Sequence, residues 1–318
     1  MNEKPVSWIE PKNFSDFWKH QISIIEQIDP KFEIIKTESF QETGLCAYFK
    51  FFGAQNETLY GFYIKHNQQE KTPVVIHFHG YWWHKGEPQD YINWFQEGYA
   101  VIVMDIRGQK GESKDTYPYK SGYKNNDHRL MIRGIEDPNE SYILHTYLDG
   151  YQLIRVAKSL PFVNENEIIL DGVSQGGSIV VALGALSQVC LICADVPGNT
   201  HFYYRYLNRS GSGAEFNDYV NENNVNAETI LNNLKYFDNV FHAKRILSPI
   251  LISAGSEDEI CPLEYFKYAY KNIKSYKHLV EYKGAGHEGG GKRHQKIKLT
   301  WVREKINECR QLVKTTIN

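Results

Sequence analysis

Ser174 lies where the sequence most clearly favours nucleophilic chemistry. It is the centre of Gly172-Val-Ser-Gln-Gly176, which follows an apolar run ending at Asp171 and precedes a helix-like stretch over 178–186. A Ser on a sharp turn between a buried strand and a helix is a nucleophile elbow, beside which only small side chains fit. Because Gly and Ser are common, the same turn can also occur without chemistry. The chemical interpretation therefore depends on which partners follow in the chain.

A base and an acid follow Ser174 in the order that such chemistry requires. Acyl transfer by serine needs a base that takes its proton and an acid that orients the base. Asp258 follows a buried strand-like run, and its neighbours Glu257 and Glu259 are alternatives that spacing alone disfavours only modestly. His287 lies on a glycine-flanked loop after the last strand-like run. The order Ser, Asp, His is that of α/β-hydrolases, so the sequence predicts a catalytic triad of these three residues.

Two backbone N–H groups are expected to hold the oxyanion that forms during acyl transfer. The first belongs to Gln175, which follows the nucleophile directly. The second comes from the loop after the strand-like run 74–78, where Tyr81 is the expected donor. The sequence therefore predicts an oxyanion hole made by Gln175 and Tyr81.

Four further residues are expected to support the site. Arg107, Gly108 and Gln109 end another strand-like run, where an Arg fork and a Gln amide could fix the loops that carry the oxyanion donors. Equally, Arg107 could simply pair with a carboxylate while Gly108 makes a turn. Glu288, beside His287, could orient its loop or merely face solvent. These alternatives stay open at this point.

His77 and His79 share one strand face, which raises the question of a metal site. No third ligand with suitable spacing accompanies them, and a zinc site would need three or four ligands. We therefore expect neither a metal nor an organic cofactor.

The elements that must position these residues alternate strand and helix along most of the chain. Strand-like apolar runs cover 74–78, 100–104, 168–170, 191–196, 250–253 and 279–282, and helix-like stretches cover 142–160, 178–187, 262–273 and 295–313. This alternation predicts an α/β fold of the α/β-hydrolase type, a mostly parallel central sheet with helices on both faces.

The remainder of the chain fits the same single domain. An expected N-terminal helix over 13–28 is followed by a β-rich extension with antiparallel runs at 32–35, 46–52 and 59–64. No repeat or linker divides the sequence, so we expect one domain over residues 1–318. The stretch of about 197–245 is expected to form a cap or an oligomer contact.

The composition is that of a soluble protein without an obvious macromolecular partner. The 318 residues are 42% hydrophobic and 23% charged, with a net charge of -2. Such a balance gives no attraction for nucleic acid or for an anionic membrane. The first residues lack the basic and apolar regions of a signal peptide, and no apolar stretch is long enough to span a bilayer. We therefore expect a cytoplasmic protein.

Together the motifs resemble carbohydrate esterase family seven, the group of acetyl xylan esterases and cephalosporin C deacetylases. The likeness extends from about Lys31 to Gly291, and its signatures are Arg107-Gly108-Gln109, Gly172-Val-Ser174-Gln175-Gly176 and His287-Glu288. The resemblance implies Ser174 as nucleophile, Asp258 as acid and His287 as base. It also implies a homohexameric ring whose enclosed sites admit small acetylated substrates.

This chain also departs from the family pattern beside the oxyanion loop. Trp82-Trp83-His84-Lys85 replaces a smaller run, and Leu263-Glu264-Tyr265 follows Pro262 where the family has a second Pro and then Ser-Thr. We expect Tyr81, Trp82, Trp83 and Pro197 to contact the substrate. Because two tryptophans would crowd the acyl site, activity should fall steeply for acyl groups longer than acetyl.

The function expected from the sequence is that of a serine carboxylesterase in carbohydrate metabolism. It would remove acetyl groups from small esters, such as acetylated xylooligosaccharides, through an acetyl-enzyme intermediate. One alternative is a serine peptidase of the prolyl oligopeptidase type, although the propeller domain usual in those enzymes has no room here. A second alternative is a binding protein that retains the fold without catalysis, against which the three intact triad residues argue.

Overall fold

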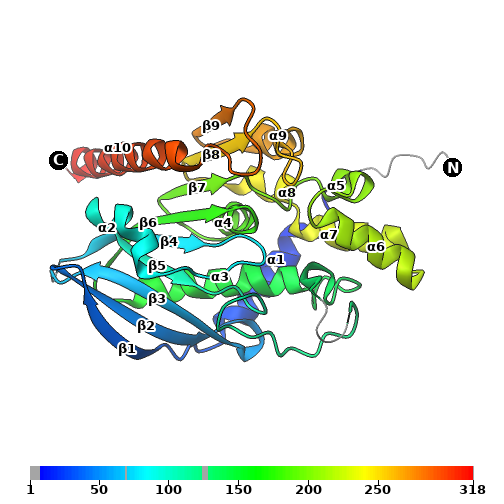
Figure 1. Ribbon diagram of the computed structural model, residues 1–318, viewed down its shortest axis with the longest axis horizontal. Helices are drawn as coiled ribbons and strands as arrows, with labels where there is room; N and C mark the ends of the chain where they lie inside the picture. Colours follow the sequence, from blue (N-terminus) through cyan, green and yellow to red (C-terminus); the bar gives the residue numbers. More distant parts are fainter. Residues whose placement is uncertain (1–7, 69, 124–127, 318) are drawn as a thin grey trace.

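The computed structural model describes residues 8–68, 70–123 and 128–317, and a single sheet forms its centre (Figure 1). Within the described residues this sheet has nine strands in the order β1-β2-β3-β5-β4-β6-β7-β8-β9. The strands are β1 Glu33–Phe40, β2 Gly44–Phe52, β3 Thr58–His66, β4 Thr72–Phe78, β5 Ala100–Met104, β6 Val163–Val173, β7 Leu191–Asp195, β8 Ile250–Gly255 and β9 Lys277–Tyr282. The helices are α1 Phe14–Glu26, α2 Ile92–Gln96, α3 Tyr142–Ser159, α4 Gln175–Leu186, α5 Phe202–Asn208, α6 Gly213–Asn223, α7 Ala227–Leu234, α8 Asn239–His242, α9 Leu263–Asn272 and α10 Gly291–Ile317.

The sheet divides into an antiparallel and a parallel part. Strands β1, β2, β3 and β5 pair antiparallel in that order, whereas β5, β4, β6, β7, β8 and β9 pair parallel. The predicted α/β fold, a mostly parallel sheet with a β-rich N-terminal extension, is confirmed. All parallel strands end at one edge of the sheet, where ligand sites of open α/β sheets form.

Strand residues alternate between two hydrophobic cores, one on each face of the sheet. Leu170 and Ile252 pack with residues of α1, α3, α4 and α9, while Ile169 and Leu251 pack with α2 and α10. Successive side chains of a strand point to opposite faces, so a strand that is apolar throughout must be covered on both sides. This explains why the central strands read as continuous apolar runs rather than as alternating patterns.

Strand β1 is longer than the sequence predicts. The expected run 32–35 becomes Glu33–Phe40 in the structure, and almost all of these residues are exposed. As an edge strand, β1 carries charged side chains that interrupt any apolar pattern, as is usual for strands that must not pair with other chains. The predicted end of this strand was therefore wrong because its hydrogen bonds to β2, not burial, define it.

The stretch after β7 is helical. It contains α5, α6, α7 and α8, and Figure 1 shows α5, α6 and α7 gathered at one end of the molecule. Since β7 leads directly into this stretch, it starts at the carboxyl edge of the sheet, beside the elbow that precedes α4.

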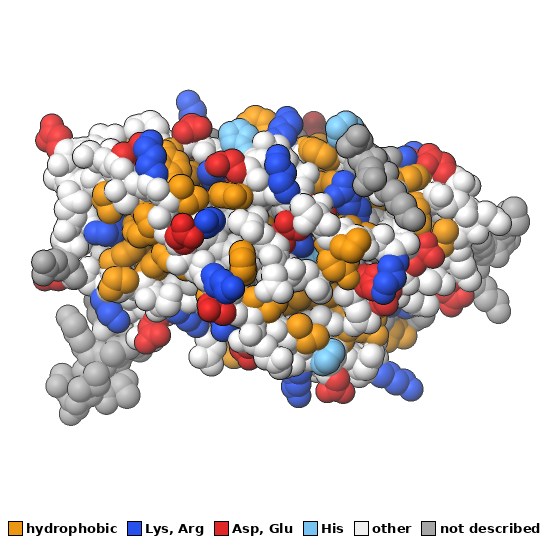
Figure 2. Space-filling view, turned by 90° about the horizontal axis from the view of Figure 1, so that it is seen from below, with side chains coloured by type: hydrophobic (Ala, Val, Ile, Leu, Met, Phe, Trp, Pro, Cys, Tyr) orange, Lys and Arg blue, Asp and Glu red, His pale blue; other side chains and the backbone are white. Residues whose placement is uncertain are grey.

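One face of the molecule mixes residue types. Figure 2 shows a face on which acidic, basic and hydrophobic side chains are interspersed. Among the described helices, none has the length and apolar character that crossing a bilayer would require.

Candidate active site

Ser174 occupies a strained turn between β6 and α4. Its φ is 58° and its ψ is -112°, a conformation that residues with a Cβ rarely adopt. The Ser174 N–H donates to the Asp195 carbonyl oxygen at 2.9 Å, and the Ser174 carbonyl oxygen accepts from the Ser178 N–H at 3.0 Å. The turn is thus anchored to β7 on one side and to α4 on the other, which keeps the hydroxyl at the carboxyl edge of the sheet.

The glycines around Ser174 are required by close packing. A Cβ on Gly176 would lie 1.9 Å from the Phe78 carbonyl oxygen, and one on Gly172 would lie 2.4 Å from the Gly176 carbonyl carbon. A Cβ on Gly177 would lie 2.7 Å from the Asp195 carbonyl oxygen. All three contacts are with backbone atoms, which cannot move aside. The glycine spacing is therefore what lets α4 approach β4 and β7 closely at the elbow.

Three side chains from separate loops form a continuous hydrogen-bonded chain. His287 Nε2 lies 2.9 Å from Ser174 Oγ, and His287 Nδ1 lies 2.8 Å from Asp258 Oδ2. The loops after β6, β8 and β9 supply these residues. Their hydrogen bonds place His287 so that one ring nitrogen faces the hydroxyl while the other is held by the carboxylate, as a triad requires.

Asp258, rather than its acidic neighbours, is the carboxylate at His287. Its second oxygen, Oδ1, accepts from the backbone N–H of Cys261 at 2.8 Å and of Ile260 at 2.9 Å. Burial would raise the pKa of Asp258, but the His287 ring and these N–H groups outweigh it and hold the pKa below its usual value. Asp258 therefore stays ionised and can stabilise a positively charged imidazole.

Gln175 is the first residue of α4, where a backbone N–H has no acceptor within the helix. Its buried side chain is held as well, because Gln109 Nε2 donates to Gln175 Oε1 at 2.7 Å and to the Tyr142 hydroxyl at 3.0 Å. Gln109 thus fixes the residue whose N–H is the expected oxyanion donor.

Tyr81 lies on a tight turn that follows β4. The Trp83 N–H donates to the Gly80 carbonyl oxygen at 3.2 Å, and Trp82 has a φ of 59°, as the third residue of a type II turn must. The Tyr81 hydroxyl accepts from the Leu130 N–H at 2.8 Å. A Cβ on Gly80 would lie 3.7 Å from Ser174 Cβ, so this turn lies directly against the nucleophile.

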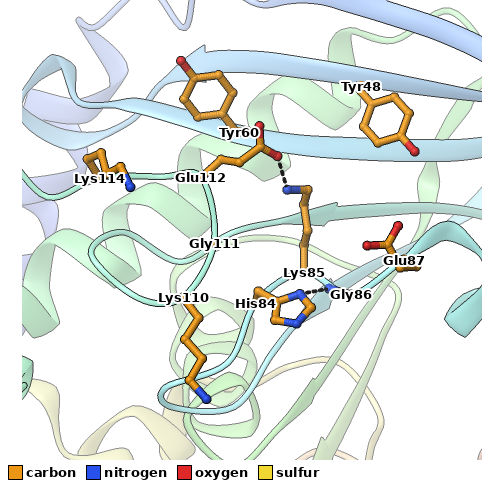
Figure 3. A pocket seen from close by; sticks show the side chains of 10 residues that line it. All are labelled: Tyr48, Tyr60, His84, Lys85, Gly86, Glu87, Lys110, Gly111, Glu112 and Lys114. Atoms are coloured by element: carbon orange, nitrogen blue, oxygen red, sulfur yellow. Dashed lines mark hydrogen bonds and ion pairs between the residues drawn. The ribbon is translucent and has the colours of Figure 1, made fainter.

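Lys85 anchors the far end of the same loop. Its backbone N–H and its Nζ both donate to the Asp105 carboxylate at 2.7 Å, and Nζ also bonds Glu112 at 2.5 Å (Figure 3). Burial lowers the pKa of Lys85, but the two carboxylates raise it by more. The pKa therefore lies above its usual value, and the side chain stays charged. Lys85 and Glu112 also line a cavity of about 690 Å³ at the base of the loop. The sequence alone predicts no such role for Lys85.

Arg107 is fully buried and forms a bidentate ion pair with Asp149 of α3, at 2.6 and 2.7 Å. Its Nη2 also donates to the Ala54 carbonyl oxygen at 2.9 Å. Arg107 therefore joins the loop after β5 to α3. Gly108 has a φ of 72°, and a Cβ there would lie 2.8 Å from Asp115 Cβ.

The residues expected to contact substrate lie around the elbow at different depths. Trp82 packs partly buried with Tyr81, whereas the Trp83 side chain is 55% exposed and stacks on His84. Pro197 is buried beside the elbow, 3.1 Å from the position of a Cβ on Gly177.

Glu288 is exposed, and its side chain accepts from the Gly286 N–H at 3.2 Å. This contact stays within the loop that carries His287, so Glu288 braces that loop from its solvent side.

His77 and His79 are engaged in separate hydrogen bonds. His77 Nδ1 lies 2.8 Å from Asp171 Oδ2, while His79 Nε2 accepts from the Ile106 N–H at 2.9 Å. Burial lowers the pKa of His79 to about 4, so this ring stays neutral. Within the described residues, no group of three or more His, Cys, Asp and Glu side chains is arranged to hold a metal ion.

A buried charge network lies behind the His287 loop. Lys298 of α10 donates to Asp171 at 2.6 Å and to Asp195 at 2.5 Å, and His294 Nε2 lies 3.0 Å from Asp195. These side chains line a cavity of about 480 Å³ that Glu288 also borders. No sequence pattern predicts this network, because a lysine within a polar helix pattern is typical of a solvent-exposed face.

The fold and the Ser174–His287–Asp258 geometry define an α/β-hydrolase with a serine-based site. The family model described as acetyl xylan esterase matches residues 4–305. The chain therefore belongs to the acetyl xylan esterase family, which confirms the resemblance found in the sequence and agrees with the expected class of carboxylesterase.

Individual relatives agree with this assignment. Acetyl xylan esterase 1 from Thermoanaerobacterium sp. JW/SL YS485 is 29% identical, with a TM-score of 0.86 over 95% of this chain and 96% of that chain. Acetyl xylan esterase from Paenibacillus sp. R4 is 24% identical, with a TM-score of 0.87 over 93% of this chain and 95% of that chain. This likeness supports the fold. The acetyl esterase Axe7A of Xylanibacter ruminicola is 25% identical over 267 residues, 79% of this chain. The chain spans only 58% of that protein's length.

Proposed function

We propose that the protein is a serine esterase that removes acetyl groups from small O-acetylated substrates, such as acetylated xylooligosaccharides. The observation that carries this proposal is the hydrogen-bonded chain from Ser174 Oγ through His287 to Asp258, at 2.9 and 2.8 Å. Family membership and the names of the relatives support acetyl esters as the substrate class.

In the first half of the reaction Ser174 Oγ attacks the acetyl carbonyl carbon while His287 Nε2 takes the hydroxyl proton. Asp258 holds the ring at Nδ1 and stabilises its positive charge. The carbonyl oxygen becomes an oxyanion that the N–H groups of Gln175 and Tyr81 hold. His287 then gives its proton to the departing sugar alkoxide, and an acetyl-enzyme with an ester bond to Ser174 remains.

In the second half the same groups act on water. His287 Nε2 takes a proton from a water molecule, whose oxygen attacks the acetyl carbonyl carbon of the acetyl-enzyme. The second oxyanion occupies the same N–H pair. Its collapse releases acetic acid, which ionises to acetate in solution, and the proton on His287 returns to Ser174 Oγ, so the enzyme is regenerated.

The direct test is acetate release from acetylated xylooligosaccharides by the wild type and by Ser174→Ala. We expect release by the wild type, a loss of more than about a thousandfold in the variant, and covalent labelling of Ser174 by an active-site phosphonate. A wild type that neither releases acetate nor reacts with the phosphonate would overturn the proposal in favour of a binding protein. Faster cleavage of proline-containing amide reporters than of acetyl esters would favour the peptidase alternative.

The acyl range and the assembly complete the proposal. Trp82, the third residue of the turn that carries Tyr81, supports a preference for acetyl. Turnover of propionyl and butyryl esters should therefore fall steeply; equal turnover would refute this. A homohexamer is proposed from the family resemblance, and sedimentation of the purified chain measures the number of subunits.

A further inference from the structure

Arg205 of α5 is a buried cation that has no carboxylate partner in the part of the chain that the structure describes. Its side chain is 3% exposed, and no acidic side chain among the described residues forms an ion pair with it. Its Nε also has no hydrogen-bond partner among those residues. Arg107, which is equally buried, has Asp149 as a bidentate partner instead. Because burying an unpaired charge is strongly unfavourable, the state of Arg205 suggests that a partner outside this chain completes it.

Two buried hydroxyl groups next to Arg205 also lack hydrogen-bond partners among the described residues. These are Ser210 Oγ and Ser212 Oγ. They flank Gly211, where a Cβ would lie 2.3 Å from Arg205 Nη2, and the Ser210 N–H donates to the Arg205 carbonyl oxygen at 3.1 Å. The turn that follows α5 therefore lies directly against the guanidinium. Within the described residues, these two hydroxyls and the Nε of Arg205 lack hydrogen-bond partners, and together they form a set of donors for an anion.

This cluster is adjacent to the nucleophile. Burial raises the pKa of the Cys261 thiol, whereas the side chains of Arg205 and Ser174 both lower this pKa. Cys261 Sγ lies 3.4 Å from the position of a Cβ on Gly198, which is itself 3.8 Å from the Ser174 carbonyl oxygen. Arg205 also lies beside the loop that carries the triad carboxylate, because the Cβ position on Gly211 is 2.3 Å from Arg205 Nη2 and 2.9 Å from the Ile260 carbonyl oxygen. The Ile260 N–H in turn donates to Asp258 Oδ1 at 2.9 Å.

We propose that Arg205, with Ser210 and Ser212, binds a carboxylate on the alcohol part of the substrate. A guanidinium fork matches the two oxygens of a carboxylate, and the hydroxyls can donate to the same oxygens. The favoured substrates would then be acetylated sugar acids, in which a uronate carboxylate lies close to the acetylated hydroxyl. This inference rests on the proposed esterase function and specifies its substrate class.

Two substrates that differ at one group provide the kinetic test. Acetylated methyl glucuronoside carries a carboxylate where acetylated methyl glucoside carries a hydroxymethyl group. We expect the wild type to prefer the first in kcat/KM, and Arg205→Gln to lower the ratio of the two values by about ten- to a hundredfold, as loss of one charged hydrogen-bond pair implies. In the control Arg209→Gln, at the end of the same helix and ion-paired with Asp218, the ratio should stay at the wild-type value. An unchanged ratio in Arg205→Gln would overturn the inference.

A binding measurement separates this inference from the esterase proposal. Glucuronate, at concentrations where glucose has no effect, should raise the melting temperature of the wild type and of Ser174→Ala, but not that of Arg205→Gln. Because the variant removes an unpaired buried charge, its own melting temperature should be no lower than that of the wild type. If glucuronate shifts neither the wild type nor Ser174→Ala, the anion site is refuted even when acetate release is normal. If acetate release fails while the glucuronate shift depends on Arg205, only the esterase proposal falls.

Discussion

The hydrogen bond between Gln109 and Gln175 should couple the stability of the site to its chemistry. The two side chains are 8% and 5% exposed, and their amide groups meet at 2.7 Å. Gln109→Leu would leave Gln175 Oε1 buried without this donor. Leaving one buried polar group unpaired costs about 1–3 kcal/mol of unfolding free energy. We therefore expect Gln109→Leu to be destabilising by about that amount.

The double variant gives the sharper expectation. When both partners of a buried hydrogen bond are replaced by apolar groups of similar shape, the change can be nearly neutral. Gln109→Leu combined with Gln175→Leu should therefore cost less than the two single changes together, with a coupling of about 1–2 kcal/mol. Tyr142 keeps its own hydrogen bond to the Arg107 carbonyl oxygen at 2.8 Å, so the surroundings are not otherwise disturbed.

Urea unfolding of the four proteins measures the coupling, and kcat for an acetyl ester measures the effect on the oxyanion donor. Complete loss of such a donor costs about 2.7–4 kcal/mol of transition-state stabilisation. Displacement of Gln175 in Gln109→Leu should cost part of this, about tenfold in kcat, with KM little changed. If the single effects on stability add within about 0.5 kcal/mol in the double variant, the proposed pairing is refuted. If kcat is unchanged while stability falls, Gln109 supports the fold but not the donor.

Three further outcomes can be measured in the same way. Asp258→Asn should lower kcat about ten-thousandfold in an acetate-release assay, because the imidazole loses the carboxylate that orients it; a loss below about tenfold would contradict that role. Lys298→Met should lower the unfolding free energy, measured by urea unfolding, by about 3–5 kcal/mol, because Asp171 and Asp195 lose their buried cation. The control Lys296→Met, at an exposed position of the same helix, should change urea unfolding little. Burial raises the pKa of both aspartates, but Lys298 and their other partners hold it below the usual value. The stability they contribute is therefore complete above a pH of about 4 and lost as pH falls further; a flat urea midpoint across that range would exclude this linkage.

The triad could be predicted from the sequence because its signals are local. Ser174 has glycines at fixed spacing, and Asp258 and His287 each follow an apolar run at the end of a strand. Parallel strands bring their carboxyl ends to one edge, so the order of the three residues was enough to expect their contact. The glycine spacing also has a local cause, since the Gly176 Cβ position collides with the Phe78 carbonyl oxygen.

Two buried charged groups could not be predicted, because their surroundings depend on distant residues. Arg205 and Lys298 are charged residues within helices, and in sequence they resemble solvent-exposed positions. Only the fold shows that Lys298 meets Asp171 and Asp195, while Arg205 is buried and has no carboxylate partner within the described part of the chain. For Arg107 both interpretations were possible from the sequence. The structure favours the simple ion pair with Asp149, whose position 42 residues later no spacing rule specifies.

The strained backbone at Ser174 lowers the stability of the protein but is required for its activity, so selection for one works against the other. A φ of 58° suits glycine, and holding a residue with a Cβ in such a conformation costs about 1–3 kcal/mol. Replacing Ser174 by glycine would release that strain at the expense of the nucleophile. A laboratory selection that rewards heat resistance alone would therefore favour inactive descendants of this protein, so thermostable lineages must be screened for turnover at every round.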